Sequence, residues 1–195
     1  MGLRLRPFLS AAMLALAVVS TPALSQDGGW FIGAGGGQTK FEGGCTAFPG
    51  PGSCDDNGTY WKVFGGYQFN AYFGFELGYA DFGKMERQTT GVGSDTFEAT
   101  AFESVLVVTI PFTQAFSIYG KYGIYRWDVD SSATGPAAFT ASSSGRDITY
   151  GFGVKYDLTK NFALRLEWQR YFDVGDALTG SFDVEASLLG IAIKF

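Results

Sequence analysis

The chain has 195 residues, a formal net charge of −5 and no His. The absence of His excludes Ser-His-Asp triads and His-ligated metal sites. The acidic balance argues against nucleic-acid binding. A carboxylate-pair hydrolase that uses Asp55, Asp56, Asp81 or Asp95 stays formally possible, but solvated loop acids are far commoner than catalytic ones. We therefore expect no enzyme activity and no cofactor.

Residues 1–25 have the pattern of a secretory signal peptide. A basic start with two Arg residues is followed by the apolar run 8–19 and by small residues before Gln26. The apolar run is too short for a membrane-spanning helix, which argues against a retained N-terminal anchor. The sequence predicts export, removal of the signal peptide, and one domain over residues 26–195.

Two cysteines, Cys45 and Cys54, lie in a stretch rich in Gly, Pro and Asp. In an exported chain, two nearby cysteines are expected to form a disulfide that closes a loop. A zinc site would need four ligands, and no His is present to complete it.

Alternating or aromatic-rich runs follow one another along the rest of the chain, at 30–42, 59–70, 72–82, 96–112, 115–130, 146–158, 162–174 and 180–195. Three connections are tight, around residues 70–71, 113–114 and 159–161. The other four, at 43–58, 83–95, 131–145 and 175–179, are longer and polar. This alternation is typical of an outer-membrane barrel, in which short turns face the periplasm and long loops face outside.

The two faces of the runs differ in an unusual way. In 162–174, Phe162, Leu164 and Leu166 share one face, whereas Arg165 and Glu167 share the other. A soluble barrel would bury the bulky apolar face, but here small residues and charges occupy the narrow interior side. The sequence therefore predicts an all-β fold, an eight-stranded antiparallel up-and-down transmembrane β-barrel in the bacterial outer membrane.

Charges of both signs are expected on the inward face. An eight-stranded barrel is only wide enough for side chains to fill, and an unpaired buried charge costs several kcal/mol. We expect a salt-bridge network that fills the lumen, formed by Lys62, Glu76, Glu103, Lys121, Lys155, Asp157, Arg165 and Glu167. Two interpretations remain open: a structural plug, which the narrow bore favours, or a gate that opens a narrow low-conductance path.

Two segments resemble the transmembrane domain of the outer-membrane protein A (OmpA-like) family. They are VFGGYQFN at 63–70 continuing to FELGY at 75–79, and GVKYDLTKN at 153–161 continuing to RLEWQ at 165–169. The resemblance implies a monomeric eight-stranded outer-membrane barrel with paired core charges. With the chain ending at Phe195, it also implies a barrel without the periplasmic peptidoglycan-binding domain of longer relatives.

The resemblance assigns some of the core charges. Glu76, Arg165 and Glu167 match core charges of the family, and Lys121 occupies a basic core position. Lys155 departs from the family pattern, as does Val107, so the gate pairing described for the family does not transfer intact.

The last run ends in the apolar row Leu189, Ile191, Ile193 and Phe195. Its strand must pair with the one near Trp30 to close the barrel. A terminal aromatic residue on such a strand resembles the signal read by the outer-membrane insertion machinery, so we expect Phe195 to act in assembly.

The expected function is a structural role in the bacterial cell envelope. The expected partners are outer-membrane lipid, lipopolysaccharide and the insertion machinery. The alternative is a surface interaction protein, an adhesin or a phage or host recognition protein, that uses loops at 43–58, 83–95 and 131–145, since loops on rigid scaffolds carry binding function.

Overall fold

A computed structural model describes residues 28–45, 52–91, 93–136 and 138–195. The predicted signal peptide, residues 1–25, lies outside the described residues. The strands found in the described residues are β1 Gly29–Phe41, β2 Gly52–Asp55, β3 Asn57–Gln68, β4 Phe73–Thr89, β5 Gly93–Pro111, β6 Phe116–Ala133, β7 Phe139–Asp157, β8 Phe162–Asp176 and β9 Gly180–Lys194. Across this part of the chain, no helix is long and apolar enough to cross a membrane.

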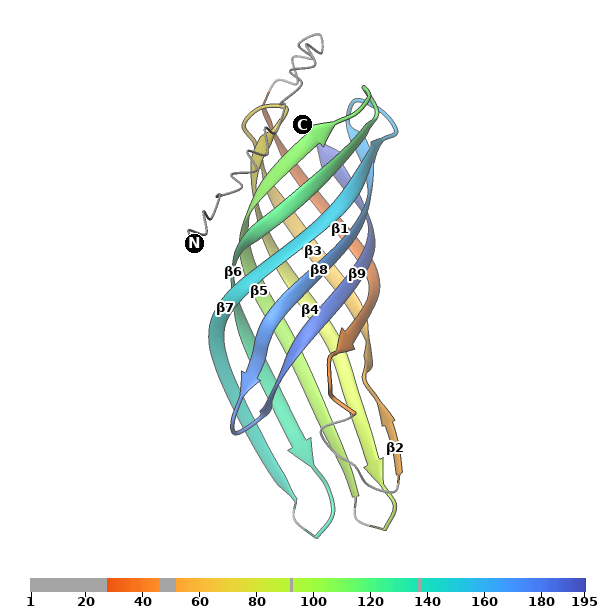
Figure 1. The fold of residues 1–195 in the computed structure, drawn as a ribbon, viewed down its shortest axis with the longest axis vertical. Helices are drawn as coiled ribbons and strands as arrows, with labels where there is room; N and C mark the ends of the chain where they lie inside the picture. The colour runs from red at the N-terminus through yellow and green to blue at the C-terminus, as the bar shows by residue number, and fades with distance from the viewer. Residues whose placement is uncertain (1–27, 46–51, 92, 137) are drawn as a thin grey trace, which may run out of the picture.

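Eight long strands close into a barrel (Figure 1). Each pairs antiparallel with the next along the chain, and β1 pairs with both β3 and β9, so that the first and last strands form the closing seam. The short strand β2 adds only to the far part of β4, where Gly52 lies opposite Thr89. The predicted eight-stranded antiparallel up-and-down barrel is confirmed.

The three tight turns share one geometry. In each, the N–H of the first residue donates to the carbonyl of the residue four positions on, and a side-chain oxygen at the second position accepts two later backbone N–H groups. The turns are Phe69–Phe73 with Asn70, Phe112–Phe116 with Thr113, and Leu158–Phe162 with Thr159. These side-chain caps satisfy the turn backbone locally, as Asx- and ST-turns do. All three turns lie at the end of the barrel that holds the C-terminus, here called the short-turn end (Figure 1).

The opposite end, here called the hairpin end, extends further than the sequence indicates. Most of the predicted loops 83–95 and 131–145 is strand, because β4 continues to Thr89, β5 begins at Gly93, β6 continues to Ala133 and β7 begins at Phe139. A transmembrane strand needs roughly 9–11 residues, whereas β5 has 19. The β4–β5 and β6–β7 hairpins reach furthest from the short-turn end (Figure 1).

Large exposed apolar side chains form a band around the outer surface, from the short-turn end to about the middle of the long strands. We call this band the apolar belt. Its hairpin-side edge includes Trp61, Tyr79, Phe102, Ile124, Ile148 and Leu189, and its short-turn edge includes Trp30, Phe69, Phe73, Phe112, Phe116, Phe162 and Phe195. Aromatic residues at both edges match the interfacial girdles of membrane barrels.

The pattern inverts where the strands leave the belt. Within the belt, β6 turns Tyr122 and Ile124 outward and buries Lys121. Beyond it, the same strand exposes Arg126 and buries Trp127. The predicted lumen of small residues and charges therefore applies only to the belt region, because beyond it the outer surface meets water and the ordinary apolar-inside arrangement returns.

Candidate functional site

Six charged side chains meet inside the belt region of the barrel. Lys62 comes from β3, Glu76 from β4, Glu103 from β5, Lys121 from β6, and Arg165 and Glu167 from β8. Each residue is at most 5% exposed. The alternation of each strand directs these residues inward, and the closed barrel brings five strands to one place. We call this group the charge cluster; its three cations and three carboxylates balance.

Close ion pairs join the cluster. Lys62 Nζ lies 2.5 Å from Glu103 Oε1, and Lys121 Nζ lies 2.7 Å from Glu76 Oε1 and 2.8 Å from Glu167 Oε1. Arg165 bridges two acids, with Nη1 2.7 Å from Glu76 Oε2 and Nη2 2.8 Å from Glu167 Oε2. A network with every charge matched is the condition under which buried ions are tolerated.

Neutral side chains complete the hydrogen bonds. The Tyr119 hydroxyl donates to Glu167 at 2.8 Å and accepts from Arg165 Nε at 3.0 Å. Glu103 accepts from Gln169 Nε2 at 2.8 Å and from the Tyr171 hydroxyl at 2.7 Å. Alternation from Glu167 along β8 reaches Gln169 and Tyr171, so the period of the strand is a signal that could have placed both in the cluster.

Glycine makes room for these large groups. A Cβ on Gly153 would lie 2.5 Å from the Tyr119 hydroxyl oxygen, and a Cβ on Gly78 would lie 3.0 Å from Lys62 and 3.1 Å from Glu103. Small residues on the inner face therefore compensate for the volume of the long charged side chains in a narrow bore.

Lys155 and Asp157, the other two predicted lumen charges, lie apart from the cluster. Asp157 forms an ion pair with Lys194, whose Nζ lies 2.6 Å from Asp157 Oδ1, and Lys155 Nζ lies 4.0 Å from the same carboxyl group. Both line a cavity of about 610 Å³ at the short-turn end, whose inner wall includes Arg165. The described residues contain no group of three or more side chains that could hold a metal ion.

Apolar and aromatic side chains fill the interior from the cluster toward the hairpin end. The Tyr171 ring lies 4.7 Å from the Phe82 ring and 5.1 Å from the Tyr125 ring, centroid to centroid. Further out, the Phe97 ring packs edge-on against Phe41 at 5.5 Å and against Phe182 at 5.3 Å. These residues form part of one buried cluster, which we call the aromatic layer.

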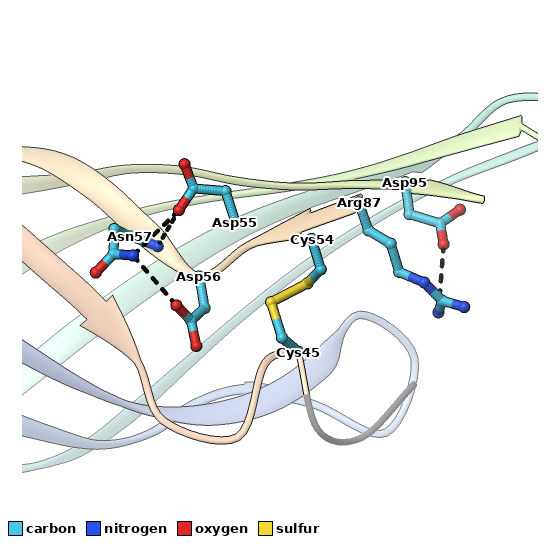
Figure 2. The surroundings of a disulfide bond; sticks show 7 residues. All are labelled: Cys45, Cys54, Asp55, Asp56, Asn57, Arg87 and Asp95. Carbon is cyan, nitrogen blue, oxygen red and sulfur yellow. Dashed lines mark hydrogen bonds and ion pairs between the residues drawn. A yellow bond between two sulfur atoms is a disulfide. The ribbon is translucent and has the colours of Figure 1, made fainter. Parts of the chain in front are cut away.

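The predicted disulfide is present at the hairpin end (Figure 2). Cys45 and Cys54 are joined by an S–S bond of 2.05 Å. Cys54 lies on β2 opposite Arg87 of β4, so the bond ties the chain after β1 to β2, which itself pairs with the extended β4. Next to it, Asp55 Oδ1 accepts the Asn57 backbone N–H at 3.0 Å and holds the step from β2 to β3.

A family model described as OmpA-like transmembrane domain matches residues 25–195. The chain belongs to the OmpA-like transmembrane domain family. This places it in the bacterial outer membrane, so the apolar belt faces lipid, the short-turn end faces the periplasm and the hairpin end faces outside.

Several relatives within this family support the assignment. The chain is 29% identical over 190 residues to outer membrane protein A of Shigella flexneri, a match that covers 96% of this chain and 53% of the relative. It is 31% identical over 199 residues to outer membrane protein A of Serratia marcescens, covering 96% of this chain and 54% of the relative. The chain thus spans about half the length of these relatives.

Solved structures show the same fold. Neisserial surface protein A superposes with a TM-score of 0.60 at 13% identity, covering 85% of this chain and 97% of that one. Ail, the attachment invasion locus protein of Yersinia pestis, superposes with a TM-score of 0.58 at 17% identity, covering 87% and 99%. Both are outer-membrane barrels, and at these identities they support the fold alone.

Proposed function

We propose that this OmpA-like domain is a structural component of the outer membrane whose lumen is closed to ions. The observation that carries the proposal is the balanced charge cluster followed by the aromatic layer. A passing ion would have to displace both. Opening the cluster separates matched charges in a buried site, and breaking one buried pair costs about 3–5 kcal/mol.

Conductance of the purified folded protein in planar bilayers tests this proposal. The wild-type protein should show no resolvable single-channel current. Phe82→Ala/Tyr171→Ala, which thins the aromatic layer, probes for a residual path. Phe112→Ala/Phe116→Ala removes two outward-facing aromatic residues and is the control. A steady wild-type current that changes in the first variant and not in the control would establish the narrow pore instead.

Surface recognition is the second candidate function. The observation in its favour is the pair of hairpins that continue beyond the belt as paired strands, with a disulfide beside them. The structure of Ail is of a complex with a heparin analogue, sucrose octasulfate. The part of this chain beyond the apolar belt is rich in acids, including Asp128 and Asp130 on β6, which disfavours a highly sulfated partner of the heparin type there. Loss of cell binding after the hairpin tips are shortened, with the barrel intact, would favour recognition over a structural role.

We further propose that Phe195 is read by the insertion machinery and that the folded protein is monomeric. The Phe195 N–H donates to the Trp30 carbonyl at 3.1 Å across the seam, while its side chain is 67% exposed. Phe195→Ala should therefore lower the yield of assembled protein without weakening the folded barrel. Equal assembly yields for the wild type and Phe195→Ala would refute the role.

A further inference from the structure

Two arginines lie directly opposite each other at the outer edge of the apolar belt. Arg126 of β6 and Arg146 of β7 are register partners, and both are exposed on the outward face. The next outward residues toward the periplasm are Ile124 and Ile148, which are 61% and 42% exposed. On the other side of Arg126, its partner on β5 is Phe102, which is 53% exposed. The two guanidinium groups therefore sit where lipid contact ends.

Their charges are poorly compensated. Arg126 Nη2 lies 3.5 Å from Asp128 Oδ1 and 3.5 Å from Ser144 Oγ, both at the limit of a hydrogen bond. The Arg146 side chain has no hydrogen bond or ion pair with any described residue. Like charges directly opposite each other on a sheet are destabilising. The two guanidinium groups thus share one exposed carboxylate, Asp128, in a 3.5 Å ion pair with Arg126.

Arg170, further along the same outer surface, shows what a compensated arginine looks like here. Its two terminal nitrogens lie 2.8 Å from Asp183 Oδ2 and 2.9 Å from Glu185 Oε1 of β9. No carboxylate on β5 or β7 takes that role for the Arg126–Arg146 pair among the described residues. Asp130, the next acid on the outward face of β6, accepts from Ser142 Oγ at 2.6 Å.

We propose that Arg126 and Arg146 together bind a phosphate of the lipopolysaccharide headgroup. The planar guanidinium fork matches phosphate oxygens, and two forks side by side can hold one phosphate with charge-assisted hydrogen bonds. The acyl chains of the same lipid lie against Phe102, Ile124 and Ile148. Lipopolysaccharide is the phosphorylated lipid of the outer leaflet, which is the leaflet at this edge of the belt. The inference rests on the proposed function, since it needs the barrel to be folded in this membrane.

Binding of lipid A to the folded protein in detergent micelles, measured by native mass spectrometry, tests the site. The Arg126→Gln/Arg146→Gln variant should bind bis-phosphorylated lipid A roughly tenfold or more weakly, because charge-assisted hydrogen bonds are lost. Lys40→Gln/Lys84→Gln changes the net charge equally at exposed lysines beyond the belt, and should bind as the wild type does. Asp128→Asn should strengthen binding, since it removes the carboxylate that competes for Arg126.

Four results would overturn the proposal, the first three of which concern the variants and the lipids. These three are equal losses in the arginine and lysine variants, equal binding of lipid A stripped of its phosphates, and an equal arginine dependence for phosphatidylglycerol. Competition by inorganic phosphate at the concentration of lipid A would also overturn it, by assigning the pair to a free anion. Failure of the proposed function has a separate signature, because it appears as channel current of the wild-type protein in planar bilayers without lipid A.

Discussion

Two glutamates on β5 show how burial alone changes the role of an ion pair. Glu103 points inward and Glu98 points outward, and each has a lysine Nζ 2.5 Å from its Oε1, from Lys62 and Lys84 respectively. The Glu103 side chain is 0% exposed, whereas the Glu98 side chain is 47% exposed. Exposed pairs contribute about 0–1 kcal/mol to stability. A buried pair that loses one partner leaves an uncompensated charge.

Glu103→Gln should therefore lower the free energy of unfolding by about 3–5 kcal/mol. Glu98→Gln should change it by less than about 1 kcal/mol. The double variant Lys62→Met/Glu103→Gln should lose less than the sum of the single losses, because no buried cation is left unpaired. Urea unfolding in lipid vesicles measures all of these. Equal effects of Glu103→Gln and Glu98→Gln would show that the cluster contributes no more than a surface pair.

At the scale of single residues, the sequence predicts that all six residues of the charge cluster point inward, because each inward position follows from alternation along its own strand. It does not predict which carboxylate each cation contacts. Lys155 of β7 lies opposite Arg165, a member of the charge cluster, on the neighbouring strand β8. Its ion-pair partner is nevertheless Asp157, at 4.0 Å, which lies outside the cluster. Partner choice depends on the height of each residue in the closed barrel, which is a property of several strands together.

At the scale of elements, β7 shows why the sequence pattern begins some strands too late, since the predicted run starts at residue 146 and the strand starts at Phe139. Its first part presents Ala141, Ser143 and Gly145 to the inside and serines to the outside, so neither face carries an apolar period. The segment is a strand because β6 pairs with it, from Ala133 opposite Phe139 onward. Gly145 also leaves space for the Trp127 ring, which a Cβ there would approach to 2.3 Å.

The disulfide is expected to hold the short strand β2 in place, because Cys54 is one of its four residues. Cys45 and Cys54 are 9 positions apart, and a crosslink over so short a loop contributes at most about 2–3 kcal/mol by chain entropy. Cys45→Ser/Cys54→Ser should speed amide hydrogen exchange in Gly52–Asp55 and leave β5 and β6 protected as before, because those strands pair with each other away from the crosslink. Unchanged exchange in β2 would mean that pairing with β4 alone holds this strand.

At the scale of the whole molecule, the seam between β1 and β9 removes the last free edges of the sheet. Glycines on β1 allow the two strands to approach. A Cβ on Gly37 would lie 1.8 Å from the Ser187 carbonyl oxygen, whereas a Cβ on Gly36 would have its nearest neighbour, the Tyr60 carbonyl oxygen, at 3.6 Å. A side chain at Gly37 would therefore collide with the backbone of β9, whereas a side chain at Gly36 has room.

Gly37→Val should prevent closure or greatly lower the yield of folded barrel, because the added Cβ meets backbone rather than a movable side chain. In Gly36→Val the added side chain points outward and its Cβ meets its nearest neighbour at an ordinary contact distance, so this variant should fold. The faster migration of an unheated folded barrel on a gel, compared with the heated sample, measures the folded fraction. Normal folding of Gly37→Val would mean that the seam can shift to accept a side chain.

The sequence by itself determined the number of long strands, the face that each belt residue occupies, the disulfide pair and the outer-membrane location. These follow from a period of two, from the two nearby cysteines of an exported chain, and from a lipid solvent that inverts the usual arrangement. The tertiary structure alone decided the ion-pair partners, the aromatic layer beyond the belt and the juxtaposition of Arg126 with Arg146. Each of these depends on register between strands, which is set by closure of the whole barrel and leaves no mark in any single segment.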